Sequence, residues 1–113
     1  MRQGLVALIL AAAFAGGLRA QSDRALVDRR ATIDAVDARI VALLNERAEV
    51  VRDVGRIKKQ SGLPANDEKR VEDVLRRIAA ANRGPLPNEH LRRIYETILR
   101  EMTAFEAADM AHR

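Results

Sequence analysis

The chain has 113 residues, of which 48% are hydrophobic and 32% are charged, and its formal net charge at pH 7 is +4. This length suits one domain, and the apolar content is too high for a disordered tail. Aromatic residues make up 3% of the chain, which disfavours a β-sandwich, a β-barrel and the stacking surfaces of single-strand nucleic-acid binders. The sequence contains no cysteine, which excludes disulfides, thiol nucleophiles and cysteine-ligated zinc. Its two histidines, His90 and His112, are too few to indicate a histidine metal site or a serine–histidine triad.

Residues 1–20 have the organisation of a secretory signal peptide. They contain Arg2 and Arg19 but no acidic residue, and the apolar run between these arginines is followed by two glycines. The run is about a dozen residues long, shorter than the ~20 that a membrane-spanning helix needs. We expect cleavage after Ala20, with the triplet Ala13-Phe14-Ala15 as a second candidate, and export to the periplasm or out of the cell. The alternatives are an uncleaved N-terminal anchor and a wrongly assigned start codon.

Removal of this segment leaves residues 21–113 as the working domain. It contains 18 lysines and arginines against 16 acidic residues, a net charge of +2. These charges are interspersed along the chain, so no nucleic-acid partner is indicated. Because the apolar segment is removed, no stable membrane association is expected after cleavage.

The first element predicted in residues 21–113 is one long amphipathic helix. Between Asp23 and Lys59 there is no proline, and apolar residues recur at spacings of three and four, which is typical of a single helix. The apolar positions are Leu26, Ile33, Val36, Ile40, Leu43, Leu44, Val50, Val51, Val54 and Ile57.

Two shorter helices follow, so the sequence predicts an all-α fold with three helices per chain. Gly62-Leu63-Pro64 ends the first helix, Asn66 or Asp67 caps the second, and Asn82–Pro85 breaks it. Pro87 suits the first turn of the third helix. The apolar positions of these helices are Val71, Val74, Leu75 and Ile78, and then Leu91, Ile94, Tyr95, Ile98, Leu99, Met102 and Phe105.

The length of the first helix predicts a homodimer. About 37 residues extend over about 55 Å, whereas a compact chain of about 93 residues has a diameter of roughly 32 Å. The apolar stripe continues along most of the helix and needs a cover, which a second copy of the same chain supplies most simply. We therefore expect an intertwined helical homodimer in which the long helices are shared. The alternative is a kink at Gly55 that shortens the helix.

Cationic residues interrupt the apolar stripe of this helix. Arg47 and Lys58 are eleven residues apart, about three turns, so they face the same way. A buried cation without a partner is costly. Apolar neighbours on both sides favour an anion-binding pocket over two side chains that reach water from the edge of the stripe. Arg30 lies about 25 Å from Arg47 along the helix, so it is expected to approach this pocket only from the partner in an antiparallel dimer.

The other two helices contribute further charged residues. Asp67 and Arg70 begin the second helix, just across the loop from Lys58. Glu106 lies one turn beyond Met102 on the third helix, beside the apolar stripe. An acid in this place is either a salt-bridge partner of the cations or a polar group aimed at a ligand.

The spacing of these residues resembles that of the all-helical (AroQ-type) chorismate mutases. The resemblance covers roughly residues 26–107. It rests on the segments Arg30–Asp37, Leu43–Arg47, Val54–Lys58, Gly62–Pro64, Asp67–Arg70, Asn82–Leu86 and Leu91–Tyr95. It implies an intertwined helical dimer with two equivalent sites that convert chorismate to prephenate by a Claisen rearrangement, a step of the shikimate pathway of aromatic amino acid biosynthesis. The reaction requires no metal and no cofactor.

The resemblance also implies roles for individual side chains. Arg47 and Arg30 of the partner subunit each hold a carboxylate of the substrate. Lys58 donates to the ether oxygen as this oxygen gains negative charge. Glu106 stands where the family has Gln or Glu, and it must be protonated to assist, which burial and the negative substrate favour. Arg70 belongs to the second-helix motif of the substrate site.

Two positions depart from the family pattern. Val71 stands where many members have a Glu that contacts the substrate 4-hydroxyl, which leaves the nearby Asp67 to bind this region. Met102 stands where members often have a Ser near a substrate carboxylate. An apolar residue at position 71 suits the related isochorismate-pyruvate lyases, which are the alternative enzyme. A non-catalytic helical dimerisation module is the third reading, and it would need the apolar stripe but not these cations at the family spacing.

Overall fold

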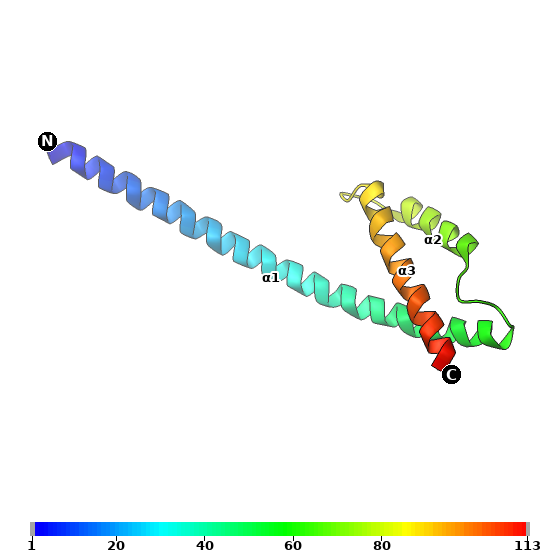
Figure 1. Ribbon diagram of the computed structural model, residues 1–113. Helices are drawn as coiled ribbons and strands as arrows, with labels where there is room; N and C mark the ends of the chain where they lie inside the picture. The colour runs from blue at the N-terminus through cyan, green and yellow to red at the C-terminus, as the bar shows by residue number, and fades with distance from the viewer. Residues whose placement is uncertain (1, 113) are drawn as a thin grey trace. The chain divides into compact units, whose positions relative to one another are not determined.

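The computed structural model describes the backbone of residues 2–112 and the side chains of residues 15–112. It contains three helices, α1 (Arg2–Gln60), α2 (Glu68–Ala81) and α3 (Asn88–His112), as Figure 1 shows. No strand occurs in the described backbone. The predicted all-α fold with three helices is therefore confirmed.

Helix α1 begins much earlier than the predicted start at Asp23, because it includes most of residues 1–20. Alanine and leucine dominate this part of the sequence, and both are strong helix formers. The side chains of residues 1–14, which include the basic start of the predicted signal peptide and most of its second cleavage triplet, lie outside the described part of the chain. The helix is continuous through Gly55 and ends five residues beyond it, at Gln60.

The chain divides into two units, residues 1–43 and residues 44–113. The first unit is a single stretch of α1, and the large apolar side chains of its described residues 15–43 are exposed. These are Leu18, Leu26, Val27, Ile33, Val36, Ile40, Val41 and Leu43. Within the part of the chain that the structure describes, no helix is long and apolar enough to cross a membrane.

The second unit contains the end of α1 together with α2 and α3. Helices α2 and α3 pack on one another through the buried residues Val74, Leu75 and Leu99. Three partly buried side chains surround this cluster, namely Val71, Ile78 and Tyr95. The core of this unit therefore lies between α2 and α3, next to the end of α1.

A glycine ends α1 in the way that the sequence predicts. Gly62 has a φ of 68°, a left-handed conformation that favours glycine. Its N–H donates to the carbonyl of Lys59, and the N–H of Leu63 donates to the carbonyl of Lys58 at 2.8 Å. This pair of hydrogen bonds is the Schellman motif, which satisfies the last carbonyls of a helix. The loop to α2 consequently starts at a fixed place and in a fixed direction.

The structure shows which residues begin α2 and α3. Asp67 rather than Asn66 is the N-cap of α2, and its carboxylate accepts the backbone N–H of Arg70 at 3.0 Å. Helix α3 begins at Asn88. The carbonyl of Pro87 accepts the N–H groups of the first turn, so Pro87 precedes the helix and does not stand inside its first turn as predicted.

Candidate active site

A pocket of about 270 Å³ lies within the second unit, where the end of α1 meets α2, α3 and the loop between α1 and α2. Six of the seven predicted site residues line it, namely Arg47, Lys58, Asp67, Arg70, Met102 and Glu106. The apolar part of its wall is Val50, Val51, Val54, Val71, Val74 and Leu99. The fold therefore brings cations and acids together on an apolar surface.

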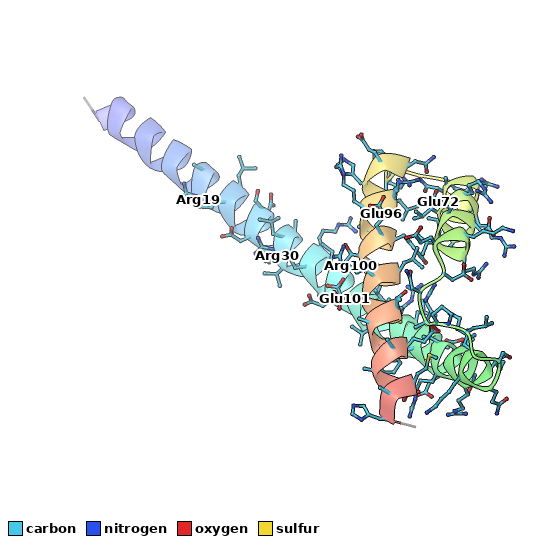
Figure 2. The ribbon with its side chains drawn as sticks, turned by 45° about the vertical axis from the view of Figure 1, so that its right-hand side comes forward. Arg19, Arg30, Glu72, Glu96, Arg100 and Glu101 are labelled. Carbon is cyan, nitrogen blue, oxygen red and sulfur yellow. The ribbon has the colours of Figure 1, made fainter. Side chains whose placement is uncertain are left out.

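The seventh predicted residue, Arg30, belongs to the other unit. It lies on α1 within residues 1–43, and its side chain is exposed (Figure 2). It is not among the residues that line the pocket.

The innermost polar contact of the pocket joins Lys58 to Glu106. The Nζ atom of Lys58 donates to Oε1 of Glu106 at 2.9 Å and to Oε2 at 3.3 Å. Glu106 is only 4% exposed, and the side chain of Lys58 is 18% exposed. Of the two readings of Glu106, the salt-bridge partner is therefore the one realised in this structure. Because the pair is largely removed from water, each charge depends on the other for its stability.

Lys58 has a second partner that fixes its direction. Its Nζ also donates to the backbone carbonyl of Ala65 at 2.8 Å. Ala65 lies in the loop between α1 and α2, so this loop holds the ammonium group in the pocket. An ammonium has three N–H groups, and here it donates to both Ala65 and Glu106.

The helix periodicity explains how α1 supplies both cations. Arg47 and Lys58 both face the pocket, and Val51 and Val54 lie between them on the same face of the helix. Arg47 is half-buried. Its guanidinium offers a planar fork of donors suited to a carboxylate.

Helix α2 contributes a charged rim. Asp67 and Arg70 are exposed, and both line the pocket. The Oδ1 atom of Asp67 is engaged as the N-cap of α2, so this residue has a structural role whatever else it binds. Arg70 adds a third cation. Three cations against two acids give the pocket an excess of positive charge, which favours an anionic ligand.

Two pocket residues escaped the sequence analysis. Thr103 lies between Met102 and Glu106 in sequence and brings a hydroxyl to the pocket. Its place three residues before Glu106 on the third helix was a usable signal, because positions three apart share a helix face. Ala65 contributes through its backbone carbonyl, and no side-chain pattern indicates such a group.

Comparison with known proteins agrees with this geometry. A sequence model of the chorismate mutase type II family matches residues 29–107. The chain is 40% identical over 84 residues to a bifunctional chorismate mutase/prephenate dehydratase of Neisseria gonorrhoeae; the match covers 74% of this chain and 23% of that protein. It is also 40% identical over 53 residues to a chorismate mutase of Methanocaldococcus jannaschii; this match covers 47% of this chain and 54% of that protein.

A solved structure is similar as well. Chorismate mutase form II from Thermus thermophilus superposes with a TM-score of 0.66 at 36% sequence identity, covering 68% of this chain and 88% of that one. The curated bifunctional relatives are much longer proteins, and the chain spans less than a quarter of the length of the first of them. The family match nevertheless includes α2, most of α3 and every residue that lines the pocket. The chain belongs to the chorismate mutase type II family.

Proposed function

We propose that the protein is a chorismate mutase, an isomerase that converts chorismate to prephenate in its own pocket. The observation that carries the proposal is the convergence of Arg47, Lys58 and Glu106 from two helices on one apolar pocket. Membership of the family supports it. The positive charge of the pocket suits a substrate with two carboxylates.

The reaction is an intramolecular rearrangement, so its atoms and electrons balance within the substrate. The carbon–oxygen bond of the enolpyruvyl ether breaks while a new carbon–carbon bond forms, and three electron pairs shift around a six-membered ring. No proton, nucleophile or second reactant takes part. The protein therefore contributes by selecting a reactive conformer and by stabilising the charge that develops on the ether oxygen.

The pocket residues suit these tasks. Arg47 binds one carboxylate with its guanidinium fork. Lys58 donates one of its N–H groups to the ether oxygen instead of to Glu106. This oxygen becomes negative as the carbon–oxygen bond breaks. Glu106, when protonated, donates to the same oxygen. The valines of α1 and α2 exclude water and hold the substrate in its compact form, in which the reacting carbons are close.

We infer that the working form is a homodimer in which Arg30 of the partner subunit completes the site. Among the described residues of the second unit, the buried apolar core consists of Val74, Leu75 and Leu99. A core of this size is small for a chain of this length, so a larger apolar cover is needed. The exposed apolar side chains of residues 15–43 on α1 can provide it in a second copy, and this stretch carries Arg30.

We also propose that residues 1–20 are a signal peptide and that residues 21–113 act in the periplasm or outside the cell. The basic start, apolar run and small residues of this segment support the proposal. Mass spectrometry of the protein recovered from cells tests it directly. A mature N-terminus at Gln21 is expected, and an intact chain would argue for an uncleaved anchor.

An isochorismate-pyruvate lyase is the second candidate, favoured by one observation. Val71 lines the pocket and packs against the core, so the wall next to Arg70 is apolar at the position where many family members place a carboxylate. An apolar wall here suits a substrate that has no hydroxyl at the corresponding carbon.

One assay separates these readings. Purified protein is incubated with chorismate and, separately, with isochorismate, and the loss of each substrate and the product formed are followed. Loss of chorismate with formation of prephenate supports the mutase, whereas release of pyruvate from isochorismate alone supports the lyase. Arg47→Ala should abolish the activity, and Arg56→Ala, an exposed change on the same helix, should leave it unchanged. If neither substrate is turned over, the result would support the non-catalytic dimerisation module.

A further inference from the structure

We propose that Gly55 and Met110 position Glu106 against Lys58, so that the last turn of α3 sets the geometry of the ion pair in the pocket. The positioning itself is a property of the fold. Only its effect on turnover rests on the function proposed above.

Helices α1 and α3 lie close together at Gly55, which is buried. A Cβ atom built on Gly55 would lie 3.2 Å from Cγ of Glu106 and 3.2 Å from Cγ of Met110. Both distances are tighter than ordinary van der Waals contact, so a side chain here would push its neighbours away. Glycine is a poor helix former, so its presence inside α1 is explained by this close approach and not by helix stability.

The residues form two adjacent contacts between the same helix faces. Gly55 and Lys58 are three residues apart on α1, and Glu106 and Met110 are four apart on α3, so each pair shares a face. Met110 therefore lies over Gly55 in the turn next to the Lys58–Glu106 pair. The depth at which Met110 packs determines how far the carboxylate of Glu106 stands from Lys58.

The end of α3 is tied down by two further contacts. Lys59 donates from Nζ to the backbone carbonyl of Met110 at 2.9 Å. The Nε atom of Arg52 forms an ion pair with Oδ1 of Asp109 at 3.4 Å, and the side chain of Asp109 is 15% exposed. Both contacts use residues beyond the segment 29–107 that the family model matches. The last turn of α3, beyond this segment, thus holds Glu106 against α1.

The effect on catalysis follows from the size of the displacement. A methyl group at position 55 forces Glu106 or Met110 to give way by a few tenths of an ångström. A group that stabilises charge in the transition state is sensitive to misplacement on this scale, and a 1 Å error can cost about a hundredfold in rate. Substrate binding, which depends on the arginine forks, should change little.

The test combines a stability measurement with kinetics. The unfolding midpoint is measured for Lys58→Met, for Glu106→Gln and for the double variant. The coupling between Lys58 and Glu106 is the difference between the midpoint shift of the double variant and the sum of the two single shifts. It is measured in three backgrounds: wild type, Gly55→Ala, and Gly55→Ala combined with Met110→Ala. The kcat and KM for chorismate are measured in the same three backgrounds.

We expect Gly55→Ala to weaken the coupling and to lower kcat by about two- to tenfold, with KM within about twofold of wild type. Met110→Ala should restore part of both in that background, because it removes one of the two side chains that the new methyl group crowds. Unchanged coupling in Gly55→Ala would overturn the proposal, and so would a loss of coupling that Met110→Ala does not relieve. If wild type does not turn over chorismate, the proposed function fails, but the coupling measurement still decides this inference.

A second variant keeps the test decisive if Gly55→Ala does not fold. Lys59→Met removes the hydrogen bond to the carbonyl of Met110 without adding bulk against α3. It should weaken the coupling between Lys58 and Glu106. Lys69→Met, an exposed lysine change on α2, is the matched control and should leave the coupling intact. Equal coupling in the two lysine variants would contradict a role for the last turn of α3.

Discussion

Lys58 and Glu106 are separated by 48 residues in the sequence, yet the Nζ of the lysine lies 2.9 Å from Oε1 of the glutamate. The pair sits at the inner end of the pocket, and the glutamate is almost fully buried. The same two groups thus serve the fold in the free protein and are available to the substrate in the proposed reaction. Removing either one should reveal both roles.

Lys58→Met should destabilise the protein, because it leaves the buried carboxylate of Glu106 without its cation. We expect a loss of about 1–3 kcal/mol in the free energy of unfolding, measured by urea titration. Glu106→Gln should cost less, since an amide oxygen still accepts from the lysine. Arg56→Met breaks an exposed ion pair with Asp53 on α1, and as the control it should cost no more than about 0.5 kcal/mol. A loss in Lys58→Met as small as in this control would contradict the structural role of the pair.

Asp67→Ala should lower stability by about 0.5–2 kcal/mol, because the N-cap of α2 is lost. Asp67→Ser keeps an oxygen that can accept the N–H of Arg70 and should retain most of the stability. Thermal unfolding of the two variants measures the capping contribution. A comparison of their KM values then separates the cap from substrate binding. Equal activity in Asp67→Ser and wild type would show that Asp67 acts through the cap alone.

A mixture of two inactive variants tests whether Arg30 acts across a dimer. Arg30→Ala and Lys58→Met should each abolish turnover, since each removes one residue from both sites. After they are unfolded and refolded together in equal amounts, random pairing leaves about one quarter of all sites intact. We therefore expect recovery of about one quarter of the wild-type rate. Arg29→Ala, a neighbouring exposed arginine change, should be active alone, and no recovery in the mixture would place Arg30 outside the partner's site.

The sequence predicted much of the fold because helix periodicity relates distant residues on one face. Arg47 and Lys58 share the face of α1 that lines the pocket, as their spacing required. The end of α1 at Gly62 followed from glycine and the proline beyond it. The start of α1 was wrong, because the apolar N-terminal segment was read as a separate leader although its residues also favour a helix.

The finer features of the site depend on contacts between helices, which periodicity does not encode. The ion pair of Glu106 with Lys58 was one of two open readings, because the depth of α3 on α1 decides between them. Gly55 was considered as a kink, but its absent side chain instead gives Glu106 and Met110 room to pack. The carbonyl of Ala65 contributes backbone chemistry that no residue type reveals.

The short connection between α1 and α2 holds both the backbone and the side chain of Lys58. The carbonyl of Lys58 accepts the N–H of Leu63, and its ammonium group donates to the carbonyl of Ala65. Surface loops usually tolerate insertions and deletions, but a change of length here would shift the backbone atoms that anchor this lysine. Chimaeras that exchange helices between members of the family should therefore take this connection and the end of α1 from the same parent protein.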